Sequence, residues 1–128
     1  MGYKHKYYNI KTKTADGIVF DSQREACRWE ELRLLERSGA ITELKRQVKY
    51  EIIPAQYEVY ERFSKDGNRL KPGTRLVERK AEYIADFVYN DAKTGELIVE
   101  DAKGIRTKDY ILKRKLMLLV NGIKIKEV

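Results

Sequence analysis

The segments AEYIADFVY at residues 81–89 and LIVEDAK at residues 97–103 decide the fold of this chain. Both are rich in β-branched and aromatic residues, and a short Lys-Thr-Gly turn at residues 93–95 separates them, which predicts an antiparallel hairpin. The first segment belongs to a long strand expected over residues 75–90. Because its apolar residues lie on both faces, we expect it to occupy a central position in a sheet.

A first helix is expected over residues 22–38. Ser22 is a good N-cap, Glu25 completes a Ser-x-x-Glu capping box, and Gly39 is a stop signal. Apolar residues recur at three-residue intervals and predict one buried face, made of Ala26, Trp29, Leu32 and Leu35. Cys27 and Trp29 are interpreted as core residues and not as site residues.

The remaining pattern predicts further strands and a second helix. Strands are expected from Ile41 to near Pro54 and over residues 57–63, followed by the tip of an exposed hairpin in SKDGNRLKPGT at residues 64–74. A helix over residues 108–120 should use an apolar face made of Tyr110, Ile111, Leu112, Leu116, Leu118 and Leu119. The last residues, IKIKEV, predict a closing edge strand. The fold class is therefore α/β, with a basic arm at residues 1–14 and a single domain at residues 15–128.

Charge and composition restrict the function. The chain has 128 residues, 27 Lys and Arg against 20 Asp and Glu, a net charge of +7 and a pI of about 9.4. This excess favours a polyanionic partner, with nucleic acid first and an anionic membrane surface second. Neither a signal-like segment nor an apolar run of membrane-spanning length is found, so a cytoplasmic location is expected. With one Cys and one His, any metal must be held by oxygen ligands.

The hairpin also carries the candidate chemistry. Since side chains alternate along a strand, Asp101 and Lys103 should point to the same side, and Glu100 and Ala102 to the other. The short connection lets Asp86 lie close to Asp101. Two adjacent carboxylates repel each other unless a cation lies between them, and Mg²⁺ is the natural cation because it accepts one or two carboxylates plus water and phosphate oxygens. Lys103 could position an attacking water, and Glu25 could act as a helper.

The order of these motifs resembles the PD-(D/E)xK nuclease superfamily, which includes restriction enzymes and archaeal-type Holliday junction resolvases. Ser-x-x-Glu at residues 22–25, Ile-Ala-Asp-Phe at 84–87 and Val-Glu-Asp-Ala-Lys-Gly-Ile-Arg-Thr at 99–107 are similar to small uncharacterised phage proteins of that superfamily. Position 85 is Ala where the name of the motif has Pro. The resemblance implies a restriction-endonuclease-like mixed sheet flanked by helices, with residues 55–80 as an inserted hairpin.

The resemblance further implies an Mg²⁺-dependent DNA endonuclease, with Mn²⁺ able to substitute. Asp86, Asp101, the backbone carbonyl of Ala102 and Glu25 would bind metal, and Lys103 would be catalytic. Branched or structured DNA in phage replication, recombination or packaging would be the substrate, and the location would be the host cytoplasm. A homodimer would be needed to cut two strands. The alternatives are a non-catalytic DNA-binding protein that retains the nuclease fold, and a basic protein of membrane surfaces.

Each site residue also has a plainer interpretation. Asp86 could be an acid at a sheet edge paired with a basic residue, Asp101 and Lys103 a solvated ion pair, and Glu25 a helix cap alone. The candidate DNA contacts could equally be solvated surface; they are Lys108, Lys113, Lys115, Arg106, Gln47 and Lys49, with Arg114 in the same helical charge run. The interleaved Tyr3, Tyr7, Tyr8, Lys4, Lys6 and Lys11 suit stacking and phosphate contact, although a floppy terminus is favoured, and His5 is expected to be inert.

Overall fold

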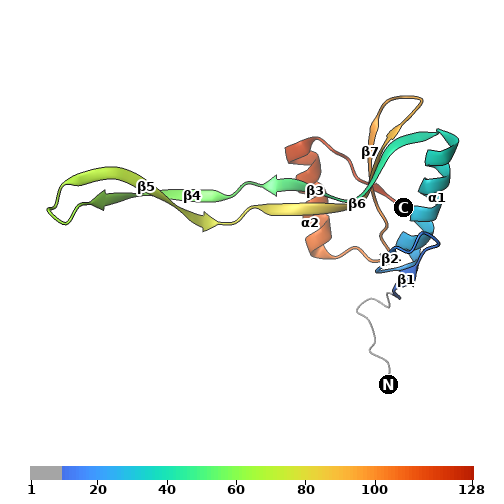
Figure 1. The fold of residues 1–128 in the computed structure, drawn as a ribbon, viewed down its shortest axis with the longest axis horizontal. Helices are drawn as coiled ribbons and strands as arrows, with labels where there is room; N and C mark the ends of the chain where they lie inside the picture. The colour runs from blue at the N-terminus through green and yellow to red at the C-terminus, as the bar shows by residue number, and fades with distance from the viewer. Residues whose placement is uncertain (1–9) are drawn as a thin grey trace, which may run out of the picture.

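The computed structural model describes residues 10–128 and has a mixed α/β architecture (Figure 1). The elements in chain order are β1 (Thr12–Lys13), β2 (Val19–Phe20), α1 (Gln23–Ser38), β3 (Ile41–Ile53), β4 (Gln56–Phe63), β5 (Arg69–Glu78), β6 (Ala81–Asp91), β7 (Leu97–Asp101), α2 (Lys108–Asn121) and β8 (Lys126–Glu127). No helix among these residues is both long enough and apolar enough to cross a membrane.

The central sheet has the strand order β3-β6-β7-β8. β6 is antiparallel to both neighbours, and β8 is parallel to β7. The predicted central position of β6, its hairpin with β7 and the closing edge strand are therefore confirmed. Gly95 adopts a φ of 74° in the β6–β7 turn, a conformation that glycine adopts without the steric cost of a Cβ. The strand expected over residues 75–90 is interrupted, because Arg79 and Lys80 separate β5 from β6.

The two helices cover opposite faces of this sheet. Trp29 and Leu32 of α1 pack with Phe87 of β6 in one cluster. Tyr110 and Met117 of α2 pack with Val88 in the other. Phe87 and Val88 are adjacent on one strand, so their side chains leave the sheet on opposite sides. The core thus consists of two apolar layers with β6 between them.

The helix α1 begins as the sequence predicts, with the Ser22 hydroxyl accepting a hydrogen bond of 3.2 Å from the Glu25 N–H. Leu35 is 38% exposed, so its predicted burial is wrong. A three-residue step turns a helix by about 300°, and side chains at this spacing drift round the axis until Leu35 points about 180° away from Ala26. Cys27 is exposed as well, contrary to its interpretation as a core residue.

The helix α2 is capped by Thr107, whose hydroxyl accepts from the Tyr110 N–H, and ends at Gly122. Its expected apolar face is only partly correct. Tyr110 and Met117, seven residues apart, are buried, whereas three of the predicted core leucines are exposed: Leu112 at 58%, Leu118 at 55% and Leu119 at 81%. The helix is apolar on two sides, and the sheet covers one of them.

β4 and β5 form a two-stranded ribbon that projects away from the rest of the molecule (Figure 1). We call residues 54–80 the arm. Its turn is formed by residues 64–68, with Gly67 at a φ of 82°. Pro72 and Gly73, predicted in the turn, lie within β5 instead. Gly73 is opposite Tyr60, and a Cβ at this position would come within 2.6 Å of the Tyr60 ring, so the ring packs directly on the glycine backbone.

The N-terminal boundary also differs from the prediction. Thr12 and Lys13 form β1, which pairs with β2, and Thr14 is buried. Residues 12–14 therefore belong to the folded part of the chain and not to an irregular basic N-terminal segment ending at residue 14. Ser22 and the start of α1 follow this small hairpin directly. The interpretations of Tyr3, Lys4, His5, Lys6, Tyr7 and Tyr8 lie outside the described residues.

Candidate active site

Asp86 and Asp101 lie on neighbouring strands at the same level. The β6–β7 register pairs Phe87 with Glu100 and Val88 with Val99, and its continuation by one residue places Asp86 opposite Asp101. Directly opposite residues of an antiparallel pair have Cβ atoms about 5 Å apart on one face. Asp86 Oδ2 accepts a hydrogen bond of 2.9 Å from the Ala102 backbone N–H. The predicted approach of the two carboxylates is therefore present.

Asp101 is almost fully buried at the end of β7, two residues before the predicted end of that strand. The Tyr83 hydroxyl donates a hydrogen bond to Asp101 Oδ2. Burial, followed by this hydrogen bond, raises the pKa of Tyr83, so the hydroxyl keeps its proton and remains a donor. Asp101 Oδ1 has the Lys103 ammonium 3.1 Å away, but accepts no hydrogen bond of good geometry from residues 10–128.

The pKa of Asp86 is raised to about 8. Burial is the largest cause, followed by the hydrogen bond with Asp101 and the negative charges of Asp101 and Glu25, while the Ala102 N–H acts in the opposite direction. A carboxylate in this position is stabilised by a proton or by a cation. The pair can therefore bind a positive charge that neither residue would bind as strongly alone.

Glu25 approaches this pair from α1. Its carboxylate, unlike its N–H, takes part in no hydrogen bond or ion pair with residues 10–128, so the capping box is only half formed. Burial, then the charges of Asp21 and Asp101, raise the pKa of Glu25, whereas Lys103 and Arg46 lower it. The Glu25 side chain thus lies within electrostatic reach of Asp101 and Lys103, and helix capping alone does not account for its position.

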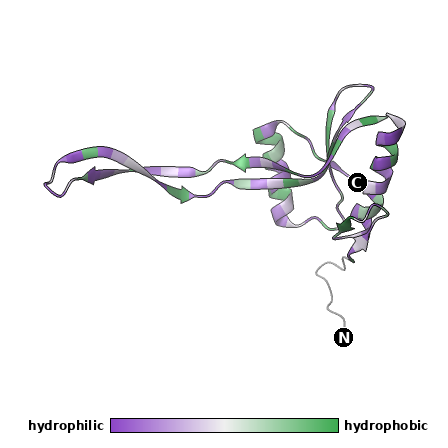
Figure 2. Cartoon of the chain, in the orientation of Figure 1, coloured by the Kyte–Doolittle hydropathy of each residue, from purple (hydrophilic) through white to green (hydrophobic). Residues whose placement is uncertain are grey.

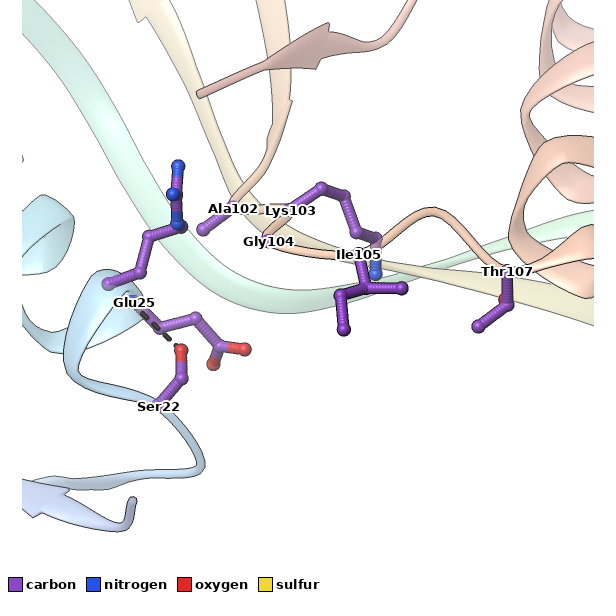
Figure 3. Close-up of a pocket in the computed structure, with 8 residues that line it drawn as sticks. Ser22, Glu25, Ala102, Lys103, Gly104, Ile105 and Thr107 are labelled. Atoms are coloured by element: carbon purple, nitrogen blue, oxygen red, sulfur yellow. Dashed lines mark hydrogen bonds between the residues drawn. The ribbon is translucent and has the colours of Figure 1, made fainter. Parts of the chain in front are cut away.

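A pocket of about 200 Å³ lies between the start of α1 and the end of β7 (Figure 3). It is lined by Ser22, Arg24, Glu25, Ala102, Lys103, Gly104, Ile105 and Thr107. A second pocket of about 230 Å³ lies beside it and contains Asp101, Tyr110 and Lys113. Lys103 and Thr107 line both pockets, and the Lys103 ammonium is also 4.5 Å from the centre of the Tyr110 ring. Lys103 therefore lies between the two pockets.

The described residues contain no group of three or more His, Cys, Asp or Glu side chains close enough together to hold a metal ion. Asp86 and Asp101 meet, while Glu25 is not close enough to complete a three-carboxylate site. The predicted ligand set is thus brought together only in part. Mg²⁺ is commonly held by one or two carboxylates with water completing its shell, so the carboxylate pair still matches the preference of this ion.

Glu100, the other acid of the motif, faces the opposite side of the sheet. Arg28 Nε donates to Glu100 Oε1 at 2.8 Å, and a second guanidinium nitrogen donates to Oε2 at 2.9 Å. The Tyr89 hydroxyl also donates to Glu100. This acid is fully buried and hydrogen-bonded. The predicted alternation, with Asp101 rather than Glu100 on the side of Lys103, is confirmed.

Arg46 and Tyr83 were missed as site residues from the sequence. The Arg46 guanidinium lies 4.5 Å from the centre of the Phe20 ring, its Nε is buried without an acceptor among residues 10–128, and its charge acts on Glu25. Alternation alone could not identify Arg46, because most residues of β3 are polar or charged. The Tyr83 hydroxyl could have been suspected, since a phenol inside a buried strand needs a partner.

The predicted DNA contacts are distributed around the site. Lys113 lines the second pocket, Lys49 pairs with Ile84 of that pocket, and Lys108 follows Thr107 at its rim. Gln47 has a φ of 52°, and in the register of β3 and β6 it lies opposite Asp86. Arg106 is ion-paired with Glu127. Lys115 lines another pocket, with Lys124 and Glu127, and is not brought to the site.

The raised pKa of Asp86 predicts how stability depends on pH when metal is absent. The folded state binds a proton that the unfolded state releases above a pKa of 3.8, so this contribution to stability is present below about pH 4 and is lost as the pH rises through about 8. Asp86→Asn keeps an oxygen for the Ala102 N–H. In EDTA at pH 8.5 it should stabilise the protein by about 2 kcal/mol or more, which corresponds to roughly 7 °C in Tm.

This gain should nearly disappear at pH 4, and thermal melts followed by circular dichroism at both pH values measure it. Asp66→Asn, at the exposed tip of the arm, is the matched control and should show no such pH dependence. An equal effect of Asp86→Asn at both pH values would contradict the expected charge repulsion.

Comparison with known families gives one match. A family model described as "Protein of unknown function (DUF1064)" matches residues 4–124, nearly the whole chain. Neither the curated proteins nor the solved structures give a significant match.

Proposed function

The chain belongs to the DUF1064 family, and we propose that it is a metal-dependent endodeoxyribonuclease with a restriction-endonuclease-like fold. One observation carries the proposal: the carboxylates of Asp86 and Asp101 meet across neighbouring strands, with the Lys103 ammonium 3.1 Å from Asp101. These residues form the Asp...Asp-x-Lys pattern of the PD-(D/E)xK resemblance. The mixed sheet with a helix on each face supports the proposed fold.

The donor set agrees with a hard divalent cation. Asp86 and Asp101 would hold Mg²⁺ or Mn²⁺, with the Ala102 carbonyl as a further ligand. The buried Asp101 Oδ1, which accepts no hydrogen bond from the described residues, and the mutual repulsion of the pair both favour a cation at this place. When bound, the metal would supply Lewis-acid stabilisation of the phosphodiester and lower the pKa of a water molecule.

The side chains of the chain have separate roles in this proposal. Lys103 would place its ammonium beside the scissile phosphate and balance negative charge as that charge develops. Glu25, whose carboxylate has no other partner among residues 10–128, would accept a hydrogen bond from the attacking water across the pocket. Lys113 and Lys108 would contact neighbouring phosphates and position the strand. Branched or structured DNA is the proposed substrate.

A second candidate function is DNA binding without cleavage. It is favoured by the finding that no three metal-ligating side chains meet within residues 10–128. In that case the net charge of +7 would still attract phosphate groups, and the buried acids would serve only the fold. The two candidates differ in whether a phosphodiester is broken.

A cleavage assay distinguishes them. The full chain is incubated with supercoiled plasmid, single-stranded DNA and a four-way junction, in Mg²⁺, Mn²⁺ or EDTA, and the products are separated on gels. We expect cleavage with either metal and none with EDTA, with 5′-phosphate ends that ligase can rejoin. Tight binding of every substrate without cleavage would favour the second candidate. Cleavage that persists in EDTA would contradict the metal requirement.

A further inference from the structure

The two faces of the arm differ in their contacts. On the first face the side chains contact one another, whereas on the second face apolar side chains are exposed. On the first face, Arg75 is ion-paired with Glu58 and lies over the Tyr60 ring, which packs on Gly73. The other face carries apolar side chains, which we call the apolar arm face: Tyr57 at 65% exposed, Val59 at 72%, Phe63 at 58% and Leu76 at 49%. Alternation along β4 also places Glu61, which is ion-paired with Arg69, between Val59 and Phe63 on this face. Tyr57 and Leu76 are direct cross-strand partners, and Val59 and Phe63 follow at even spacing along β4.

No other element among residues 10–128 covers this face. Apart from the pairing of β4 with β5, neither strand makes an extensive contact with another element of residues 10–128. An isolated two-stranded ribbon is marginally stable at best in water, and a row of exposed aromatic and aliphatic side chains adds to its cost. An apolar partner surface would therefore stabilise the ribbon.

The helix α2 offers a surface of that kind. Leu112, Leu116, Leu119 and Val120 follow the spacing i, i+4, i+7 and i+8, which places them along one side of the helix, roughly 120° round the axis from the buried Tyr110 and Met117. We call these four residues the α2 ridge. Leu112 is 58%, Leu119 81% and Val120 52% exposed, whereas Leu116 is partly buried. Figure 2 shows hydrophobic segments both on the arm and on α2, which lies beside the base of the arm.

We infer that the apolar arm face docks on the α2 ridge of a second copy of this chain, reciprocally, so that two copies form a symmetric dimer by exchanging arms. The arm points away from its own α2, but two-fold symmetry lets each arm reach the helix of the other copy. The apolar arm face spans about 20 Å from Tyr57 to Phe63, and the ridge about 12 Å, so a ribbon can cover the ridge.

The size and the apolar character of the two surfaces favour a second copy over nucleic acid. Reciprocal docking uses eight apolar side chains from each copy; at roughly 100 Å² each, they would bury about 1,600 Å², the size of a stable interface. Nucleic acid offers phosphates, whereas the apolar arm face presents aliphatic and aromatic groups. Arg69 and Arg75 of the arm are paired with Glu61 and Glu58, while Arg62, Lys65 and Lys71 are exposed without an ion pair among residues 10–128. The inference does not depend on the nuclease proposal.

Light scattering coupled to size exclusion, at micromolar concentrations of the full chain, gives the first test. The wild type should be a dimer. Val59→Lys and Leu119→Lys, on the two proposed partners, should each weaken self-association about 100-fold or more, since each change occurs twice in a symmetric dimer. Both side chains are largely exposed, so circular dichroism melts of the two variants should stay close to the wild type.

Leu34→Lys is the matched control, because Leu34 is 62% exposed on α1, outside both surfaces, and this variant should remain a dimer. A wild type that stays monomeric at every concentration overturns the inference. So does a Val59→Lys variant that loses DNA binding while the wild type is monomeric, since the arm would then bind nucleic acid instead.

Crosslinking defines which surfaces meet. In a Cys27→Ser background, which removes the exposed native cysteine, Val59→Cys and Leu119→Cys proteins are mixed and treated with a short bismaleimide. Dimers that join position 59 of one copy to position 119 of the other support the exchange. Crosslinks formed by the Val59→Cys protein alone would show that the arms pack on each other, which overturns docking on the α2 ridge.

Discussion

Asp101→Asn should lower metal-dependent DNA cleavage by about 10²- to 10³-fold or more, and Lys103→Ala should have an effect of similar size. Asp101 would lose the charge that shares a cation with Asp86, while its amide could still accept from the Tyr83 hydroxyl. Lys103 would lose the ammonium that lies 3.1 Å from Asp101 and lines both pockets. Initial rates on the best substrate of the cleavage assay measure both effects.

DNA binding should change little in these variants, because Asp101 is buried and Lys103→Ala removes only one of the basic residues around the pockets. Fluorescence anisotropy in Ca²⁺ or EDTA measures this binding without turnover. Asp66→Asn and Lys93→Ala, which make the same side-chain changes at exposed turns, should cleave like the wild type. Retention of full activity by Asp101→Asn would remove the carboxylate pair from the mechanism.

Arg28→Ala should destabilise the fold by about 3–5 kcal/mol, because it leaves the fully buried Glu100 without its cationic partner. The Tyr89 hydroxyl would remain as a donor, but it carries no positive charge. A domain of this size is stable by only about 5–15 kcal/mol, so the variant should approach the limit of folding. Urea unfolding at pH 7, with the midpoint and slope fitted together, measures the loss.

The double variant Arg28→Met with Glu100→Leu is the informative companion. Apolar side chains of similar volume remove both charges, so most of the lost stability should return. A double-mutant cycle then gives the coupling between the two side chains. Arg33→Ala, whose 3.7 Å contact with Glu36 is partly exposed, is the control and should cost less than about 1 kcal/mol. A small effect of Arg28→Ala would mean that water reaches Glu100.

Elements with strong local signals could be predicted from the sequence. The Ser22 cap, the turn before Gly95 and the alternating apolar strands act through neighbouring residues, so their positions follow from local chemistry. The spacing of Asp101 and Lys103 likewise places them on the same side, and Glu100 on the other. Where the signal was weak, as for Pro72 and Gly73, the prediction was wrong, because both lie within β5 and the cross-strand pairing of Gly73 with Tyr60 overrides turn chemistry.

The candidate site shows the same division. The proximity of Asp86 to Asp101 could be predicted from the short turn that joins their two strands. The contributions of Arg46 and Tyr83, in contrast, depend on contacts between residues distant in sequence. Glu25 illustrates the limit: its capping position was visible, and only the packing of α1 against the sheet shows that its carboxylate faces the pocket with Lys103.

The sequence by itself determined the helices, the central hairpin, the basic charge and the side of the strand on which Asp101 lies, since these depend on composition and local periodicity. The tertiary structure alone decided that Glu25 stays short of a three-carboxylate cluster, that Glu100 is paired with Arg28, and that residues 10–128 leave the apolar arm face and most of the α2 ridge exposed. Burial and distance between remote residues follow from how the sheet and helices pack, and no local pattern records that packing.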